Sequence, residues 1–385
     1  MVRRIGLIAI PVAAVVLAVV SVASAKPASH AAAAAASCSN VKIGMQAPIT
    51  GPAGSIGSDQ LHWAEFYFTQ WNKTHKPKIT LVQEDTQLDP SKASTTAQAL
   101  ASNAAVMGVI GPAGSDEVQA VAPIFKKAGL AFASGSATRV SLTNGAWKGY
   151  FFRDVPNDGV QGPTDAAYMM SKLGVTKGSK VMVVDDQESY STGLADIVQQ
   201  TLTNAGVTVD RESVSQKATD FSSLIAKVDS STKVVFLPFQ IAAEAQLFAQ
   251  QLQAQGKSAV PFGSDGTFDA TNFTSNGAYI SFFAPDVTTI PADAAIVKSF
   301  HKQFPGATSP FGAPNYVLAQ MYAAAITKAC SDGKISRAEV RKDVLKVSLP
   351  STILGGPIKL TANGDVAGAK FHIFKIENGK YVTVA

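Results

Sequence analysis

Short apolar runs alternate with stretches of helical spacing through most of this 385-residue chain. The run at residues 106–110 has the unbroken apolar character of a strand that is covered on both faces. Elsewhere, apolar residues recur three to four positions apart, which predicts amphipathic helices. One such set is Leu61, Ala64, Phe68 and Trp71. The predicted strands are residues 41–45, 79–82, 106–110, 130–133, 180–184, 207–209, 234–237 and 259–263. This alternation predicts an α/β fold with mostly parallel sheets that carry helices on both faces.

The predicted elements form two halves, followed by a different C-terminal part. The halves meet near residues 153–163, a stretch that contains proline and glycine. After residue 284 a proline-rich segment leads to two more helices, at residues 292–303 and 315–329. The last part predicts short antiparallel strands at residues 357–360, 371–376 and 381–384. Asn363-Gly364 and Asn378-Gly379 are typical of hairpin turns.

The first 37 residues have the pattern of an export signal and a spacer. Arg3 and Arg4 precede an apolar run, and Ala23-Ser24-Ala25 supplies the small residues of a cleavage site. The run has roughly 16 residues, whereas a bilayer span needs about 20. We therefore predict a signal peptide at residues 1–25 and an alanine-rich spacer at 26–37, with an uncleaved anchor as the alternative. The mature protein is expected outside the cytoplasm, in the periplasm or at the cell surface.

The composition of the chain excludes several classes of function. The chain is 46% hydrophobic and 16% charged, which is typical of a globular protein with more than one core. Its formal net charge is +5, without a dense run of lysine or arginine, so a nucleic-acid partner is not expected. The five histidines are scattered and none has a second one at metal-ligand spacing. We predict neither a metal nor a cofactor.

The two cysteines, Cys38 and Cys330, predict one disulfide, because an even count in an exported chain is compatible with pairing. The bridge would join the start of the first strand to the end of a late helix. Lipidation of Cys38 is the alternative.

Small and hydroxyl-bearing residues follow several predicted strands, where ligands of open parallel sheets bind. Ser115 stands at the start of a helix, where its hydroxyl and nearby backbone N–H groups can face an anion. Ser136 and Thr138 follow the next strand, and Asp265 follows a strand of the second half. A carboxylate and an ammonium group are the charges that such residues can bind. Each residue also has an ordinary structural explanation, as a helix cap, a polar loop or a turn.

Enzyme motifs are missing from the sequence. It contains no G-x-S-x-G or H-E-x-x-H pattern, and Gly51, Gly54 and Gly57 do not have the spacing of a dinucleotide site. A secreted hydrolase with Ser115 as nucleophile would need a base, and no histidine falls at a predicted strand end. We therefore predict that the protein is not an enzyme.

The chain resembles the exported substrate-binding proteins of branched-chain amino acid ABC transporters, which have the type 1 periplasmic binding protein fold. The resemblance covers residues 41–385. It rests on Pro48-Ile49-Thr50-Gly51-Pro52, Asp89-Pro90, Val109-Ile110-Gly111, Gln161-Gly162-Pro163, Asp220-Phe221-Ser222 and the turn at residues 263–266. It implies two lobes joined by a three-segment hinge. Lobe I would comprise residues 38–155 and 285–350, and lobe II residues 156–284 and 351–385.

The resemblance also implies roles for single residues. Ser115 and Thr138 match positions that bind a ligand carboxylate, and the Ser136 carbonyl matches one that receives an ammonium group. Asp265 falls where the family usually has Glu. Tyr190 and Phe311 match aromatic positions that cover the ligand.

Other positions depart from the family pattern and would change the side-chain pocket. Ile56 stands where Tyr is common, and Ala113 where a larger aliphatic residue is common. Phe239 or Gln240 fills a further lining position, and the register leaves both open.

We predict an exported solute-binding receptor of an ABC importer. It would bind a small amino acid, branched-chain or related, by lobe closure and deliver it to a membrane permease. A monomer is expected. A ligand sensor that signals through a membrane protein is the alternative.

Overall fold

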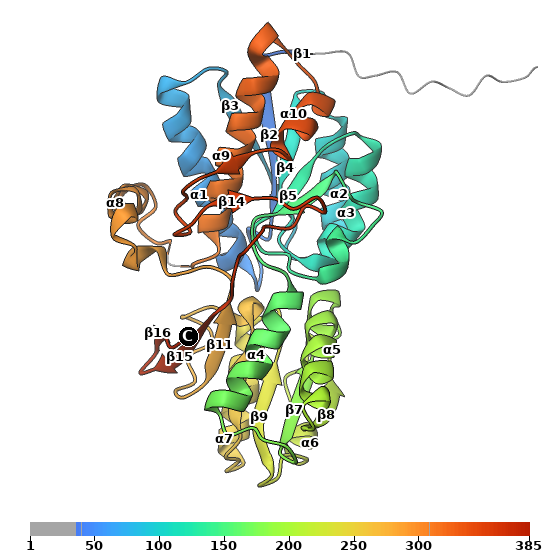
Figure 1. Cartoon of the computed structure of the whole chain (residues 1–385), viewed down its shortest axis with the longest axis vertical. Helices are drawn as coiled ribbons and strands as arrows, with labels where there is room; N and C mark the ends of the chain where they lie inside the picture. The colour runs from blue at the N-terminus through green and yellow to red at the C-terminus, as the bar shows by residue number, and fades with distance from the viewer. Residues whose placement is uncertain (1–35, 40, 308) are drawn as a thin grey trace, which may run out of the picture. The chain divides into compact units, whose positions relative to one another are not determined.

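The structure is a computed structural model that describes residues 36–39, 41–307 and 309–385. The predicted signal peptide and the spacer up to residue 35 lie outside the described residues. The described chain contains two large sheets, each with helices on both faces, which form two lobes (Figure 1). The predicted α/β fold class is confirmed.

Lobe I is built on a five-stranded parallel sheet in the order β3-β2-β4-β5-β6. Its strands are β2 (Val41–Ala47), β3 (Ile79–Asp85), β4 (Val106–Ile110), β5 (Phe132–Ser134) and β6 (Phe151–Arg153). Its helices are α1 (Gly54–Thr74), α2 (Pro90–Ser102), α3 (Ser115–Lys127), α8 (Ala294–Gln303), α9 (Gly312–Ala329) and α10 (Arg337–Val344). Short turns η1 (Val140–Thr143), η3 (Val287–Thr289), η4 (Pro291–Asp293) and η5 (Cys330–Asp332) connect them.

The two faces of the lobe I sheet pack against different helices (Figure 1). Ile43 and Met45 of β2 pack into the core with α1 and α9, whereas the Gly44 position between them faces Leu100 of α2. This follows from the alternation of side chains along a strand. Tyr322 of α9 donates to the Val109 carbonyl, 3.0 Å away, which anchors this late helix to the sheet.

Lobe II is built on a seven-stranded sheet in the order β16-β15-β11-β10-β9-β7-β8. Its strands are β7 (Lys180–Asp185), β8 (Thr208–Ser213), β9 (Thr232–Leu237), β10 (Val260–Gly263), β11 (Tyr279–Phe282), β15 (His372–Glu377) and β16 (Lys380–Thr383). Its helices are α4 (Asp158–Lys172), α5 (Ser189–Asn204), α6 (Ser222–Ile225), α7 (Ala242–Ala254) and the turn η2 (Asp265–Thr267). Val181 and Val183 face the core with α4 and α5, and Met182 and Val184 face the core with α7.

The last two strands of lobe II are antiparallel, as the sequence predicts. Glu377 pairs with Lys380 across a two-residue turn, Asn378-Gly379, in which both residues have positive φ. This is the geometry that an Asn-Gly hairpin favours. The strand predicted at residues 357–360 is shorter: β14 (Ile358–Lys359) pairs only with β13 (Ser348–Leu349).

The chain passes between the lobes three times, after β6, after β11 and after β14. The first passage is shorter than the predicted joint at residues 153–163, because α4 already begins at Asp158 and includes Pro163. Asn157 caps α4 by accepting a hydrogen bond from the Gly159 N–H. The predicted lobe boundaries after residues 155, 284 and 350 stay predictions.

Cys38 and Cys330 form a disulfide with their Cα atoms 6.0 Å apart. It joins the segment before β2 to the turn η5 after α9. Near it, the short strand β1 (Ala36–Ser37) pairs with β12 (Lys334–Ile335). The N-terminal end of the described chain is therefore attached to lobe I.

Candidate ligand-binding site

A small cavity lies where the carboxyl ends of strands from both lobes meet. It is lined by Ile56, Leu88, Ala113, Gly114, Ser115, Ser136, Tyr190, Gln240, Asp265, Gly266 and Phe311. Its volume is about 40 Å³, whereas one water molecule needs about 10–15 Å³ on the same measure. The cavity therefore has room for only a few water molecules, and hydrogen bonds that cross between the lobes beside it hold the lobes together.

Ser115 is the first residue of α3 and is buried. Its Oγ accepts a hydrogen bond from the Arg139 N–H at 3.3 Å, which leaves the hydroxyl hydrogen free to donate. The first-turn N–H groups of a helix lack intrahelical partners, and the helix dipole favours an anion there. Ser115 thus combines a hydroxyl donor with a helix N-terminus at one wall of the cavity.

Ser136 and Thr138 come from the loop after β5. The Ser136 hydroxyl donates to the Ala113 carbonyl (2.9 Å) and accepts from Gln60 Nε2 (2.8 Å). Its side chain is therefore fixed by lobe I, while its backbone carbonyl makes no hydrogen bond to a described residue. Thr138 is fully buried and does not line the cavity. Its hydroxyl makes no hydrogen bond of ordinary geometry to a described residue, but it lies beside Asp158 and lowers the pKa of that carboxyl.

Asp265 is the first residue of η2, directly after β10, and lies at the lobe II wall of the cavity. Its Oδ1 atom accepts from Gln161 Nε2 at 2.6 Å and from the Tyr190 hydroxyl at 2.7 Å. Its Oδ2 atom accepts no hydrogen bond from a described residue and is not fully enclosed. Oδ2 is therefore the oxygen that can bind a group inside the cavity.

Burial raises the pKa of Asp265 to about 7, and the negative charge of Asp158 adds to this effect. The hydrogen bonds from Tyr190 and Gln161 act in the opposite direction but are weaker. Of the described residues that line the cavity, none is lysine, arginine or histidine. A cationic group in the cavity would therefore stabilise the ionised form of Asp265.

Two more carboxyl groups lie buried behind Asp265. Burial raises the pKa of Asp158 to about 6 and that of Asp165 well above its usual range. Ser281 connects Asp165 to the cavity wall, because it accepts from Gln161 (3.0 Å) and donates to Asp165 Oδ2 (3.1 Å). A cationic group in the cavity would favour the ionised form of these carboxyl groups, so this part of lobe II suits a positive charge.

Apolar side chains form the rest of the wall. Ile56, Leu88 and Ala113 come from lobe I, and Phe311 precedes α9. The Phe311 ring is buried and lies edge-on to Phe282, with ring centroids 4.9 Å apart. These residues offer an apolar surface beside the polar groups.

The structure separates the two alternatives at residues 239 and 240. Phe239 is fully buried in the lobe II core, where its ring lies near those of Phe221 and Phe248. Gln240 lines the cavity instead. Its backbone N–H donates to Asp186 Oδ2 at 2.9 Å, which fixes its position.

Hydrogen bonds cross between the lobes beside the cavity. Asp116 of α3 accepts from the Ser189 N–H of α5 (2.6 Å) and from Gln240 Nε2 (3.2 Å). Gln119 Nε2 donates to the Ser189 hydroxyl (2.9 Å), and Arg139 donates to the Ser189 carbonyl. A single lobe I carboxylate therefore contacts the start of α5, where Tyr190 is the next residue.

The cavity thus brings together seven of the predicted site residues: Ile56, Ala113, Ser115, Ser136, Tyr190, Asp265 and Phe311. The sequence did not single out Leu88, Gly114 or Gly266 as lining residues, nor Gln161 as a partner of Asp265. Leu88 lies in a loop after β3 with φ +59°, where no periodicity indicates its direction. Gln161 belongs to a stretch on which the family resemblance rests, and this could have identified it as a site residue.

Two α/β lobes that close on a cavity with a carboxylate, free hydroxyls and an apolar wall define a solute-binding protein. The model of the periplasmic binding protein family matches residues 40–380. The chain belongs to this family, and its fold is the type 1 periplasmic binding protein fold.

Relatives support this assignment along most of the chain. A Leu/Ile/Val-binding protein homolog of Brucella melitensis is 27% identical over 89% of this chain and 93% of its own length. The leucine-specific-binding protein of Salmonella typhimurium is 25% identical over 90% of this chain and 93% of its own.

Solved structures share the fold. A leucine-binding protein from Thermotoga maritima has a TM-score of 0.81 at 20% identity, covering 90% of this chain and 98% of its own. A branched-chain amino acid transporter substrate-binding protein from Streptococcus pneumoniae, in complex with isoleucine, has a TM-score of 0.78 at 21% identity, covering 90% and 99%. A solute-binding protein from R. palustris in complex with benzoate has a TM-score of 0.77 at 20% identity, covering 90% and 95%.

The protein is a binding protein and not an enzyme, as its family membership establishes. Membership also implies an extracytoplasmic location. Among the described residues, no helix combines the length and the apolar character needed to cross a membrane. No group of three or more histidine, cysteine, aspartate or glutamate side chains in the described chain could hold a metal ion.

Proposed function

We propose that the cavity binds a small α-amino acid with an apolar side chain, branched-chain or related, as a zwitterion. The observation that carries this proposal is the position of Asp265, which lines the same cavity as Ser115 at the N-terminus of α3 and whose Oδ2 accepts no hydrogen bond from a described residue. A buried carboxylate without a cation is costly, and a ligand ammonium group would offset that cost.

Each end of the ligand has a chemical counterpart. The ammonium group binds to Asp265 Oδ2 and to the Ser136 carbonyl. The carboxylate binds to the Ser115 hydroxyl and the α3 N-terminus. Thr138 contributes its hydroxyl after that group turns from Asp158 toward the cavity. Charge-assisted hydrogen bonds of this kind are about twice as strong as neutral ones. Ile56, Leu88 and Phe311 contact the apolar side chain, with Tyr190 covering the ligand from lobe II.

Binding requires the lobes to open and close. A cavity of about 40 Å³ is too small for an amino acid to enter or occupy without movement. Hydrogen bonds across the lobes at Asp116 exist only when the lobes are together, so they favour the closed form. Ligand contacts from both lobes would shift the population toward this form. The closed protein would then deliver its ligand to a membrane permease, most simply as a monomer.

A thermal-shift panel of the twenty L-amino acids tests the ligand class. A ligand at 100 times its Kd stabilises the folded protein by about 2.7 kcal/mol. We expect leucine, isoleucine, valine or a related small apolar amino acid to raise the melting temperature. We expect no rise with 4-methylpentanoate, which is leucine without its amine. A panel in which benzoate or 4-methylpentanoate is stabilising and no amino acid is would contradict the proposal.

A further inference from the structure

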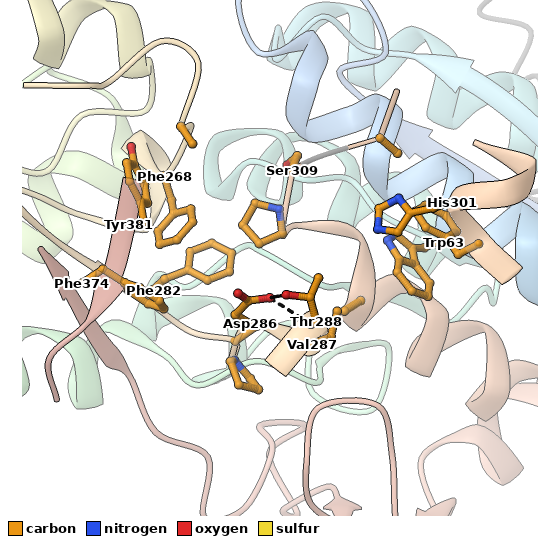
Figure 2. Close-up of a pocket in the computed structure, with 17 residues that line it drawn as sticks. Trp63, Phe268, Phe282, Asp286, Val287, Thr288, His301, Ser309, Phe374 and Tyr381 are labelled. Carbon is orange, nitrogen blue, oxygen red and sulfur yellow. Dashed lines mark hydrogen bonds between the residues drawn. The ribbon is translucent and has the colours of Figure 1, made fainter. Parts of the chain in front are cut away.

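A second cavity of about 240 Å³ lies between the lobes, where the chain leaves lobe II after β11 and runs toward α8 of lobe I (Figure 2). It is six times as large as the cavity at Asp265 and shares no lining residue with it. An apolar cavity of about 150 Å³ holds a benzene molecule. This second cavity is therefore large enough for an aromatic ring.

Aromatic side chains dominate the lobe II wall. Phe268, Phe282, Phe374 and Tyr381 gather on one side of the cavity in Figure 2. Their rings meet mostly edge-on: the Phe268 centroid lies 4.9 Å from that of Phe374 and 4.5 Å from that of Tyr381. Such a wall favours another aromatic ring, because ring edges and faces carry opposite partial charges.

The opposite wall belongs to lobe I. Trp63 of α1 is stacked on Phe300 of α8, with centroids 3.8 Å apart, and His301 lies beside it (Figure 2). At the rim, Asp286 Oδ1 accepts from the N–H and the hydroxyl of Thr288. Its other oxygen accepts no hydrogen bond from a described residue, so a hydroxyl donor on the occupant can use it.

We propose that this cavity is a second binding site for a neutral, single-ring aromatic molecule with one hydrogen-bond donor. The ring lies between the lobe II aromatic wall and Trp63, and the donor points to Asp286. This site is separate from the amino acid site and does not depend on it.

The two cavities are separated by aromatic side chains that contact each other. Phe282 lines the second cavity and contacts Phe311, which lines the first. Phe268 follows Asp265 by three residues. Because the occupant contacts both lobes, it also favours the closed form. This coupling rests on the proposed function, whereas binding itself does not.

The test uses p-cresol as the probe, with binding measured by calorimetry on the full mature chain without amino acid. Thr288→Trp fills the cavity from an exposed rim position, and Thr289→Trp is its matched control, since Thr289 is exposed and outside the lining. We expect one p-cresol per protein in the wild type and in Thr289→Trp, and at least tenfold weaker binding in Thr288→Trp. Equal binding in both variants, or no binding to the wild type at 5 mM, would overturn the proposal.

A second measurement separates this site from the amino acid site. Asp265→Asn is expected to bind p-cresol as the wild type does, because Asp265 does not line the second cavity. Loss of p-cresol binding in Asp265→Asn with retention in Thr288→Trp would place the probe in the first cavity and overturn the proposal. Failure of every amino acid to bind would contradict the proposed function. It would not change the interpretation of p-cresol binding at the second cavity.

Discussion

The Tyr190 hydroxyl donates a hydrogen bond to Oδ1 of Asp265, 2.7 Å away, and Gln161 donates to the same oxygen. Both donors come from lobe II helices, Tyr190 from α5 and Gln161 from α4. They hold the carboxylate by Oδ1 and leave Oδ2 without a hydrogen bond to a described residue. The amino acid proposal depends on this arrangement.

Ser115→Ala is expected to weaken amino acid binding at least tenfold while the fold survives. A lost hydrogen bond to a charged group costs about 1.5–3 kcal/mol, and 1.4 kcal/mol is a factor of ten in Kd. Thr138→Ala should have an effect of the same size. Calorimetry measures both, with Ser102→Ala, an exposed serine at the end of α2, as the control. Unchanged affinity in both site variants would place the carboxylate elsewhere.

Asp116→Ala is expected to shift the protein toward the open form. The change removes the two hydrogen bonds from Ser189 and Gln240 that cross between the lobes. Amino acid release should become roughly tenfold faster, because a hydrogen bond to a charged group contributes about 1.5 kcal/mol to the stability of the closed form. Stopped-flow release and small-angle scattering of the unliganded protein measure the two effects.

The control for Asp116→Ala is Ser55→Ala, which removes an exposed contact between the lobes. Ser55 Oγ lies 2.9 Å from Asp269 Oδ2. An exposed hydrogen bond contributes little, so release should change less than about threefold. Equal effects of the two variants would show that Asp116 is not a specific closure contact.

Amino acid affinity is expected to fall as the pH drops below about 7. The pKa of Asp265 in the unliganded protein is raised to about 7, and the ligand ammonium group needs the ionised carboxylate. Below that pH, binding must release one proton, so Kd should rise about tenfold per pH unit. Calorimetry in buffers of different ionisation enthalpy would count the proton. A Kd that is constant from pH 5.5 to 8 would contradict the assignment.

Stability of the unliganded protein should show the opposite trend. Burial raises the pKa of Asp265 to about 7, that of Glu117 to about 7 and that of Glu244 to about 8. Between pH 5 and 8 the folded state therefore binds more protons than the unfolded state, so stability falls as pH rises. A melting temperature that is higher at pH 8 than at pH 5.5 would contradict this sign.

Loss of the Cys38–Cys330 disulfide is expected to lower the free energy of unfolding by about 5 kcal/mol, because it closes a very long loop. Denaturant unfolding of Cys38→Ser/Cys330→Ser measures the change. Intact-mass analysis without reductant should find no free thiol in the wild type. Two free thiols, or a lipid on Cys38, would refute the pairing in the exported protein.

Patterns along the chain predicted most of the strands and the helices that cover them, because a buried strand and an amphipathic helix have distinct periods. They failed at α4, whose Gly159, Gly162 and Pro163 are poor helix formers. The structure explains Gly162: a side chain there would lie 2.5 Å from Ile197 of α5. Tertiary packing of two helices thus overrides local propensity, which a single sequence does not reveal.

The candidate site was predictable where a residue follows a strand or matches a family position, as with Ser115, Tyr190 and Asp265. The register within one residue was not predictable, so Phe239 was predicted as a lining residue with Gln240 as the alternative, whereas Gln240 lines the cavity. Asp158 and Asp165 gave no signal either, since their proximity to Asp265 arises only when α4 packs beside η2. Contacts between residues far apart in the sequence depend on the fold and cannot be predicted from the spacing of residues along the chain.

The most direct test of the central claim is calorimetry of Asp265→Asn with the amino acid that the thermal-shift panel selects. Breaking one side of a buried ion pair costs about 3–5 kcal/mol, so we predict a Kd at least 100-fold higher than that of the wild type. Asp269→Asn, a lobe II carboxylate outside the cavity lining, is the matched control and should bind within about threefold of the wild type. Equal affinity of Asp265→Asn and the wild type, with both variants folded, would contradict the claim that Asp265 binds a ligand ammonium group.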